Sequence, residues 1–332
     1  MYRKRNWFLQ GLLYLLICTF WATGWVEPVR SQENYPTRAI TIICPFAPAG
    51  STDLAARAMI PYLNKKWGVP VNVINKPGGN GVPALLEVYN SRSDGYTMLA
   101  DGQPFCTFLG FIVKDLPFKI MDRTFVAITT QLPGVLMVPS NSPYKNLNDV
   151  IADAKKDPEN FTWASLGGVG GTDYISRQLF KAIGVDVSKT RPVMAKGGSA
   201  AAALAAGGHV KIAFASIMSA WPFIQEGGTA RVICLSWKER DELLPNVPSA
   251  TELGHPELAL PFWCGVSGPP KMPSYVVDTW DKTLREMQKD SEYVSLLKKT
   301  GFRQFYLDSK EMKQFVEKDI EMAAQVYGVK KE

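Results

Sequence analysis

The sequence predicts an α/β protein with two lobes and a hinge between them. Short apolar segments alternate with helical patterns along most of the chain, which is typical of α/β folds. Two loops of small residues, 45–53 and 165–173, each follow an apolar segment and precede a helical pattern. The turn-rich segments 139–143 and 245–261 offer two places where the chain can cross from one lobe to the other.

Nine segments rich in apolar or β-branched residues predict strands. Most of them lack strict alternation of polar and apolar residues, which indicates strands buried on both faces. Because helical patterns separate them, we expect βαβ units and parallel sheets. The predicted strands are Ile40–Cys44, Val71–Ile74, Tyr96–Ala100, Phe125–Thr130, Val135–Val138, Phe161–Ala164, Val210–Ala215, Arg231–Ser236 and Phe262–Val266.

Helical patterns fill the segments between these strands and most of the C-terminal part. Pro61 lies inside the first of them and is expected to kink the helix or delay its regular part. The final helix begins after Asp308, where Glu311 completes a capping box. The other predicted helices are Asp53–Trp67, Val82–Tyr89, Leu147–Ala154, Thr172–Ile183, Ser199–Ala206 and one or two helices over Ser274–Thr300.

The two turn-rich segments define the expected lobes. We expect the chain to leave lobe 1 near residue 138 and to return near residue 262. Lobe 1 then comprises residues 35–138 and 262–332, and lobe 2 comprises residues 139–261. Two crossing strands form a hinge, which allows two lobes to close around a ligand.

The N-terminus has the pattern of a secretory signal peptide. Three basic residues at 3–5 precede an apolar stretch over 7–21, and small residues follow at 22–24. We assign residues 1–24 to the signal peptide and leave the cleavage position open up to about residue 34. The alternative is an uncleaved segment that anchors the protein to the membrane, although the stretch is shorter than the roughly 20 residues of a membrane span.

Charge and cysteine content narrow the class of protein further. Three of the six net positive charges lie in the leader, which leaves the mature chain at +3, and its basic residues are interleaved with acidic ones. We therefore expect no nucleic-acid partner. Four cysteines remain after the leader, mostly inside apolar segments, and buried thiols are favoured over disulfides. They are Cys44, Cys106, Cys234 and Cys264.

The sequence nominates no catalytic centre. Its two histidines, His209 and His255, lie in turns and loops, and no His/Cys/Asp spacing is typical of a metal site. No nucleophile elbow, phosphate-binding loop or complete dinucleotide fingerprint occurs. We therefore predict a protein without enzymatic activity, resident metal or cofactor.

The two small-residue loops carry the functional prediction instead. Backbone N–H groups at a helix N-terminus, together with the helix dipole, favour a carboxylate or phosphate, and small residues let the anion approach closely. Two such loops indicate a ligand held between the two lobes.

Several motifs in series give the chain a family resemblance. Pro45 to Asp53, Asn75 to Gly81 and Asp94 to Leu99 resemble the opening of the Bug-type receptors, the extracytoplasmic solute-binding subunits of tripartite tricarboxylate transporters. The loop 168–172, the motif Lys196 to Gly198 and the segment Leu244 to Gly254 continue the resemblance over nearly the whole mature chain. Trp263 and the segment 269–273 extend it to the last strand.

This resemblance implies a two-lobed type II periplasmic-binding-protein fold, often called a Venus flytrap, in the periplasm. It further implies a small organic carboxylate in the cleft, namely a di- or tricarboxylate, an aromatic carboxylate or an amino acid. The implied partners are the membrane subunits of the transporter, with a sensor kinase as a further possibility. The implied ligand-binding residues are Phe46, Ala47, Ala49, Gly50, Ser51, Thr52, Asp53, Ser165, Gly168, Gly170, Gly171, Thr172, Lys196 and Gly197.

Four polar positions bear on which ligand fits. Asp53 is expected to brace its loop rather than touch an anion, although it could pair with the amino group of an amino acid. Tyr174 stands where many relatives place a histidine, and its phenol can donate a hydrogen bond. Asp101 and Gln103 follow the third strand and are candidates to face the cleft, where Asp101 would disfavour a second carboxylate.

The favoured function is therefore a receptor that hands a carboxylate to a membrane transporter. The first alternative is an enzyme on the same scaffold, because fold alone does not determine function. The second is a sensor or scavenger that works without a transporter.

Overall fold

A six-stranded mixed sheet forms the centre of lobe 1. The computed structural model describes residues 34–168 and 170–328, so the predicted signal peptide lies outside the described residues. Strands β2 and β3 are parallel to β1, whereas β10 is antiparallel to both β3 and β4, and β11 is antiparallel to β4. The order across the sheet is β11 (Arg303–Leu307), β4 (Thr124–Leu132), β10 (Phe262–Gly268), β3 (Thr97–Gly102), β1 (Ile40–Cys44) and β2 (Val71–Asn75).

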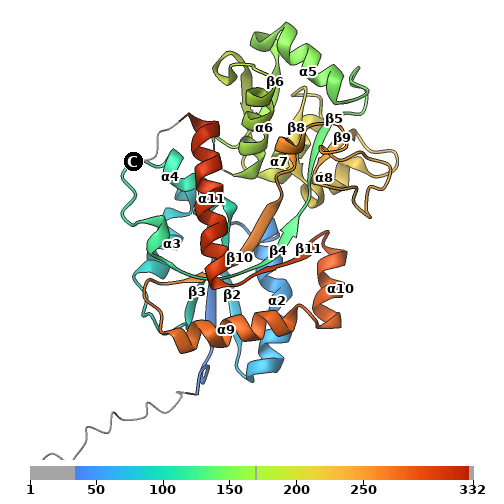
Figure 1. Cartoon of the computed structure of the whole chain (residues 1–332). Helices are drawn as coiled ribbons and strands as arrows, with labels where there is room; N and C mark the ends of the chain where they lie inside the picture. Colours follow the sequence, from blue (N-terminus) through green and yellow to red (C-terminus); the bar gives the residue numbers. More distant parts are fainter. Residues whose placement is uncertain (1–33, 169, 329–332) are drawn as a thin grey trace, which may run out of the picture. The chain divides into compact units, whose positions relative to one another are not determined.

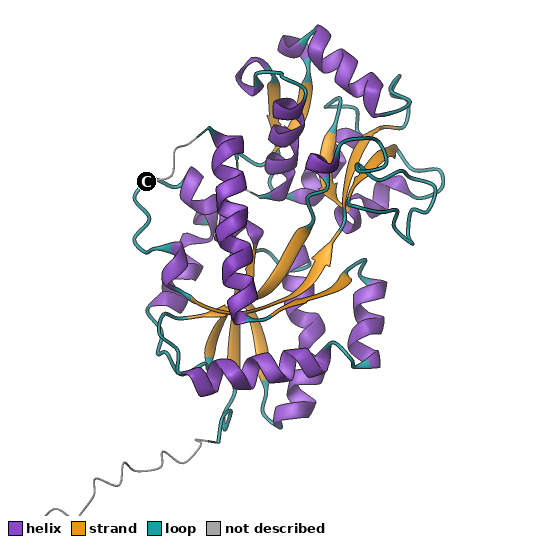
Figure 2. Ribbon diagram, in the orientation of Figure 1, coloured by secondary structure: helices purple, strands orange, loops and turns teal. Residues whose placement is uncertain are grey.

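Lobe 2 contains a three-stranded sheet and a two-stranded sheet (Figures 1 and 2). In the larger one β5 (Gly134–Pro139) lies between β8 (Ala213–Ser216) and β9 (Ala230–Ser236) and is antiparallel to both. In the smaller one β6 (Thr162–Ser165) and β7 (Arg191–Met194) are parallel. All these elements belong to one compact unit, residues 36–332.

The expectation of purely parallel sheets was wrong. Among the strands of the described residues, β1–β2, β1–β3 and β6–β7 pair in parallel and the other strand pairs are antiparallel, besides two isolated parallel bridges at Trp163–Ile212 and Leu235–Ser249. The reason is topological, because the strands that cross between the lobes enter each sheet from the opposite end. Burial of both faces makes antiparallel strands look like parallel ones in the sequence.

The first crossing lies at Pro133 and not near residue 138. β4 ends at Leu132 and β5 begins at Gly134, and β5 pairs only with strands of lobe 2. The apolar pattern is the same on both sides of Pro133, so hydrophobicity alone does not reveal the change of sheet. At the other crossing, β10 begins at Phe262, which pairs with Leu132. The two crossing segments therefore run side by side.

The described helices agree with most of the predicted ones. Two short segments of lobe 1, η2 and α4, were not predicted, and neither was α8, which contains Pro222. The strands β7 and β11 were missed as well, and β7 is a largely exposed edge strand that contains a proline. The helices are α2 (Ser51–Trp67), α3 (Val82–Tyr89), η2 (Pro104–Phe108), α4 (Leu109–Ile112), α5 (Leu147–Lys156), α6 (Gly171–Ala182), α7 (Gly198–Ala206), α8 (Ile217–Ile224), α9 (Ser274–Met287), α10 (Ser291–Lys299) and α11 (Ser309–Tyr327).

The N-termini of two of these helices can be compared with the sequence prediction. α2 starts at Ser51 and continues through Pro61, so the proline does not delay the helix. α11 starts with the predicted capping box, in which Asp308 accepts from the Glu311 N–H and the Glu311 side chain accepts from the Asp308 N–H. Such a box satisfies two N–H groups that the helix itself leaves unpaired.

The C-terminal helix α11 connects lobe 1 with lobe 2. Phe108 of η2, Tyr174 of α6 and Ala323 of α11 belong to one apolar cluster. The Tyr327 hydroxyl at the end of α11 donates a hydrogen bond to the Gly168 carbonyl, with an O–O distance of 2.7 Å. Lobe 1 therefore contacts the second small-residue loop through α11.

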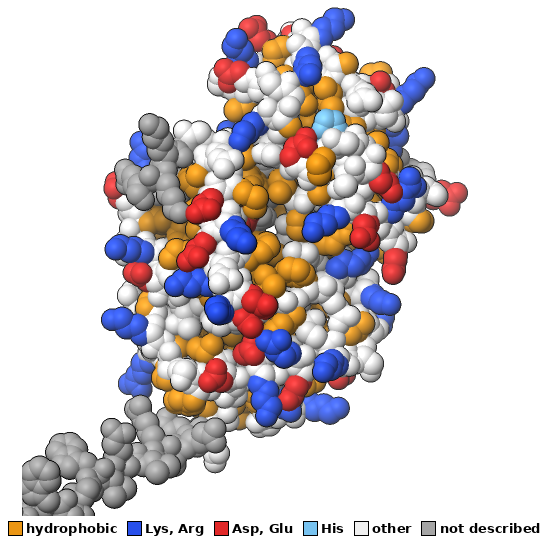
Figure 3. All heavy atoms as spheres, in the orientation of Figure 1, with side chains coloured by type: hydrophobic (Ala, Val, Ile, Leu, Met, Phe, Trp, Pro, Cys, Tyr) orange, Lys and Arg blue, Asp and Glu red, His pale blue; other side chains and the backbone are white. Residues whose placement is uncertain are grey.

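The four cysteines among the described residues are free and buried, as predicted. On the face drawn in Figure 3, basic and acidic side chains are interleaved over both lobes. This is the arrangement of an ordinary solvated surface.

Candidate functional site

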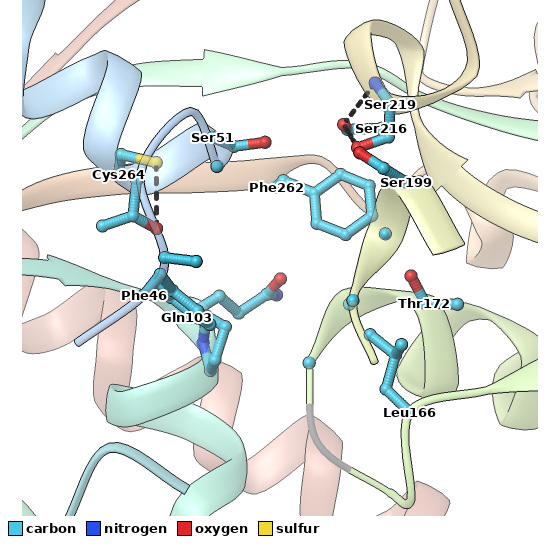
Figure 4. Close-up of a pocket in the computed structure, with 18 of the residues that line it drawn as sticks. Phe46, Ser51, Gln103, Leu166, Thr172, Ser199, Ser216, Ser219, Phe262 and Cys264 are labelled. Atoms are coloured by element: carbon cyan, nitrogen blue, oxygen red, sulfur yellow. Dashed lines mark hydrogen bonds between the residues drawn. The ribbon is translucent and has the colours of Figure 1, made fainter. Parts of the chain in front are cut away.

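A cavity of about 420 Å³ is lined by loops and strand ends of both lobes (Figure 4). Lobe 1 contributes the β1–α2 loop, the end of β3 and the start of β10. Lobe 2 contributes the starts of α6, α7 and α8. Eleven of the fourteen predicted site residues line this cavity: Phe46, Ala47, Ala49, Gly50, Ser51, Thr52, Gly170, Gly171, Thr172, Lys196 and Gly197.

The β1–α2 loop lines the cavity, and Asp53 braces it through hydrogen bonds. Ala49 adopts a left-handed conformation with φ 64°, which is unusual for a residue with a side chain. Its N–H donates to Asp53 Oδ2 at 2.9 Å. The Asp53 side chain also accepts hydrogen bonds from Arg57 and Asn75, and Asn75 donates to the Phe46 carbonyl as well. Asp53 itself does not line the cavity, which supports its bracing role.

These contacts set the protonation of Asp53. Burial favours the neutral acid, but hydrogen bonds from Arg57, Asn75 and Ala49 outweigh it and hold the pKa below its usual value. A lowered pKa means that the contribution of Asp53 to stability is present above the unfolded-state pKa, about 4, and is lost as the pH falls through the folded-state pKa.

We expect Asp53→Asn to lower the free energy of unfolding by about 1–3 kcal/mol at pH 7, because one carboxylate oxygen that accepts two charged or backbone donors is lost. The deficit relative to the unsubstituted protein should narrow as the pH falls below about 4. Urea unfolding at several pH values measures it. Asp278→Asn, on the exposed surface of α9, is the matched control and should change stability little at any pH. A deficit that stays constant down to pH 3 would contradict the proposed role of the charge.

The β6–α6 loop is built in the same way, with Asp173 in the place of Asp53. Asp173 accepts from the Ser165 hydroxyl at 2.8 Å, from the Gly168 N–H at 2.9 Å and from the Leu166 N–H. Burial raises the pKa of Asp173, and these hydrogen bonds counteract it. Ser165 and Gly168 consequently face Asp173 and do not line the cavity, whereas Gly170 and Gly171 do.

Four helices begin at the wall of the cavity. The residues preceding α2, α6 and α7 are Gly50, Gly170 and Gly197, and none of these three helices has a side-chain cap. In contrast, α5, α10 and α11, which begin elsewhere, are capped by asparagine or aspartate side chains. Uncapped N–H groups and converging helix dipoles make the cavity electropositive.

The charged side chains add to this field. Lys196 is the one charged residue among the described residues that line the cavity, and it is exposed at the mouth. No aspartate or glutamate of the described chain joins it there. The cavity can therefore neutralise an anion without exposing it to a competing carboxylate.

A cluster of serines on lobe 2 was missed by the sequence analysis. Ser216 precedes α8, and its hydroxyl accepts from the Ser219 N–H at 3.2 Å and donates to the Ser219 hydroxyl at 2.9 Å, as Figure 4 shows. Ser199 of α7 lies beside them. The spacing Ser216-x-x-Ser219 after an apolar segment is a possible N-cap pattern, but Pro222 obscured the short helix.

The start of β10 contributes the apolar part of the wall. Phe262 lies against the N-terminus of α6, where a Cβ added to Gly171 would be 2.1 Å from Phe262 Cε1. Trp263 and Cys264 follow it along the cavity. Burial raises the pKa of the Cys264 thiol to about 12, so it stays protonated and is a poor nucleophile.

Two other polar residues considered in the sequence do not line the cavity. Asp101 does not face the cavity, because it is fully buried and forms an ion pair with Arg123 at 2.8 Å. Tyr174 does not face it either, since its ring packs against Phe108 with 4.8 Å between the centroids. Gln103 does line the cavity, as expected.

The histidine and metal-site candidates among the described residues give no competing assignment. His255 interacts with Glu257 at 2.9 Å, away from the cavity. The described residues contain no group of three or more side chains placed to hold a metal ion. No helix in the described part of the chain combines the length and the apolarity that a membrane span needs.

Two proteins of Bordetella pertussis are similar in sequence to this chain over most of its length. BugT of Bordetella pertussis is 29% identical over 260 residues, which cover 77% of this chain and 78% of BugT. A UPF0065 protein of the same organism is 25% identical over 86% of this chain and 87% of its own length.

Solved structures share the fold. One described as a periplasmic transporter superposes with a TM-score of 0.79 at 27% identity, over 89% of this chain and 97% of that one. MatC from Rhodopseudomonas palustris, with bound malate, gives 0.76 at 23% identity over 88% and 100% of the two chains. A second protein from that organism, with adipate, gives 0.79 at 22% identity over 89% and 99%. These neighbours confirm the two-lobed fold.

The family comparison confirms the resemblance to the Bug-type receptors. A family model described as the tripartite tricarboxylate transporter family receptor matches residues 55–328. The match covers both lobes and the starts of α6, α7 and α8. The chain therefore belongs to the tripartite tricarboxylate transporter receptor family.

Proposed function

We propose that this protein captures a small organic carboxylate in the cavity between its lobes and delivers it to the membrane subunits of a tripartite tricarboxylate-type transporter. One observation carries the proposal: four helix N-termini and Lys196 converge on a cavity that no described acidic side chain lines. Such a site stabilises negative charge through fixed dipoles.

The size and lining of the cavity favour a small metabolite. About 420 Å³ lies within the range of small-molecule sites, and the walls combine N–H groups with the side chains of Phe46, Leu166 and Phe262. A carboxylate at the helix ends and a carbon skeleton against these apolar groups satisfy both parts of the lining. The structural neighbours described with malate and adipate are consistent with this ligand class.

The hinge supports a mechanism of capture and release. A ligand that contacts both the α2 loop and the α6 loop stabilises the closed arrangement by its additional contacts there. Since Lys196 is the one cation at the described lining, most of the attraction comes from N–H groups, whose strength suits an anion that must later be released. On closure of the two lobes, the backbone angles would change around Pro133 and the start of β10.

Binding without chemical conversion is part of the proposal. The described lining offers hydroxyls, amides, one lysine and one thiol of raised pKa, and no histidine or carboxylate placed to act as a general base. The predicted signal peptide supports delivery to the periplasm, where the transporter's receptor works.

Native mass spectrometry of protein purified from the periplasm tests this function. We expect a co-purified carboxylate that is released on unfolding, rebinds in calorimetry and is recovered unchanged. Consumption of that carboxylate by the purified protein would favour an enzyme, and a bound cation or neutral sugar in this cavity would overturn the assignment.

Lys196→Met is expected to weaken carboxylate binding by roughly three- to tenfold, because one exposed positive charge near the anion is lost. The remaining affinity should depend less on ionic strength than that of the unsubstituted protein. Calorimetry at two salt concentrations measures both effects. Lys189→Met removes an exposed lysine of the same lobe that does not line the cavity, and it should leave the affinity unchanged.

A further inference from the structure

Gln103 presents an amide oxygen to the cavity that no described residue satisfies. Its side chain is only 4% exposed, and Figure 4 shows it extending from the end of β3 toward the cavity. Its amide nitrogen donates to the Asp319 carboxylate at 3.2 and 3.5 Å. No described residue donates to its amide oxygen, and this oxygen is not one of the fully buried unpaired atoms, so an accessible acceptor faces the cavity.

Asp319 determines which end of the amide faces the cavity. It lies on α11, is 3% exposed, and also accepts from the Thr107 hydroxyl at 2.5 Å and from the Trp263 indole N–H at 3.5 Å. Because the Thr107 hydroxyl and the Trp263 indole N–H both donate to it, Asp319 acts as an acceptor, and Gln103 turns its NH₂ group toward it. Reversing the amide would bring two oxygens together.

The other polar side chains that line the cavity do not require a hydrogen-bond donor on the ligand. Hydroxyls of Ser51, Thr172 and Ser219 can either donate or accept, since each can rotate its hydrogen. Lys196 and the N–H groups at the helix ends only donate. Gln103 is therefore a fixed acceptor in a cavity otherwise suited to bind acceptors.

From this arrangement we infer that the receptor selects a carboxylate that carries a hydroxyl group, and that Gln103 is the residue that recognises this hydroxyl. The inference rests on the proposed function. A second carboxylate at this point would meet the amide oxygen with its own oxygens, and a plain alkyl group would cover the acceptor and leave it unpaired, which carries a free-energy cost. A hydroxyl pairs with it.

A neutral donor fits better than an ammonium group. An amino acid would bring a positive charge into a cavity surrounded by helix N-termini, with no described acidic side chain at the lining to pair with it. The charge of Asp319 is already engaged by its three donors. The structure therefore disfavours the amino-acid ligands that the family resemblance left open.

The position of Gln103 also limits where the hydroxyl lies on the ligand. A Cβ added to the adjacent Gly102 would be 3.7 Å from Thr52 Oγ1, so Gln103 neighbours the first turn of α2. By our proposal, a carboxylate bound at that helix end places its α- and β-carbons nearest to Gln103. We therefore expect a 2-hydroxy or 3-hydroxy carboxylate.

Calorimetry with matched ligand pairs tests this inference. The pairs are malate and succinate, lactate and propionate, and 3-hydroxybutyrate and butyrate, with aspartate and alanine as the ammonium arm. In at least one pair we expect the hydroxy member to bind about tenfold more tightly. In Gln103→Met, which keeps the side-chain length but removes the acceptor, that ratio should fall to about one while the affinity for the member without the hydroxyl is retained.

Two controls separate recognition from a folding defect. The ratio compares two ligands on the same protein preparation, so a loss of active protein affects both members equally. Asp319→Asn, which supplies an NH₂ group beside the amide and frees Gln103 to turn, should reduce the ratio without changing the residues that line the cavity.

Different outcomes would contradict either the role of Gln103 alone or the receptor function as well. Equal binding within every pair, an unchanged ratio in Gln103→Met, or a preference for the ammonium arm would overturn the role of Gln103 while leaving the receptor function intact. Failure of every carboxylate to bind, with no carboxylate released from the native protein, would overturn the receptor function and this inference together.

Discussion

Gly50→Val is expected to weaken carboxylate binding by at least about 100-fold while the protein remains folded. Gly50 precedes the first turn of α2 and lines the cavity, so a branched side chain there occupies the approach to the Ser51 and Thr52 N–H groups. Losing two hydrogen bonds to a charged ligand accounts for an effect of this size.

The fold should tolerate this substitution. Gly50 has φ −73° and ψ 162°, which any residue adopts, and an added Cβ would approach no atom closer than 3.4 Å, the Ala47 carbonyl oxygen. Gly170→Val is a less clear test of the α6 loop, because Gly170 has φ 93° and a branched residue is strained there.

Calorimetry for affinity and circular dichroism for folding measure the effect of Gly50→Val. Gly110→Val is the matched control, because Gly110 is exposed, lies outside the cavity lining and has negative φ, and an added Cβ would meet only Ile120 Cδ1 at 3.4 Å. Undiminished affinity in Gly50→Val would show that the anion does not bind at the start of α2.

Arg123→Met is expected to lower the free energy of unfolding by about 3–5 kcal/mol, because it leaves the charge of Asp101 buried without its partner. The two side chains are 1% and 0% exposed. Arg123 also donates to the Phe105 and Ile120 carbonyls, so these acceptors lose their partner too. The pKa of Arg123 is raised although burial opposes it, chiefly by the charge of Asp101.

Urea unfolding measures the loss of stability in Arg123→Met, and two further variants test its cause. Arg38→Met removes the cation of an exposed ion pair with Asp94 and should cost less than about 1 kcal/mol. The double variant Arg123→Met with Asp101→Asn should recover part of the loss, because the unpaired charge is gone. A cost for Arg123→Met as small as that of Arg38→Met would show that Asp101 does not remain buried and charged.

The ion pair also matters for the site. Asp101 belongs to β3 and accepts from the Ser267 hydroxyl of β10 at 2.5 Å, so it joins the two strands that end at the cavity. Gln103 follows on the same strand end. We therefore expect Arg123→Met to weaken ligand binding indirectly, through the position of Gln103.

Local sequence was sufficient to predict the loops that line the site. The segments 45–53 and 165–173 are rich in small residues and lie between a strand and a helix, and the first N–H groups of the helix at such a junction have no partner within the helix. The capping box at Asp308 and the burial of the four cysteines depend on equally local patterns. The series of motifs was sufficient to identify the family.

Only the tertiary structure shows which polar groups face the cavity. Asp101, Tyr174 and Gln103 all follow strands or loops in a way that allowed exposure to the cleft, but Arg123 buries Asp101 and Phe108 covers Tyr174. Gln103 reaches the cavity, and its orientation depends on Asp319, which lies on the last helix of the chain. Hydrophobic patterns report burial but not the partner that causes it, so contacts between residues distant in the chain require the folded structure.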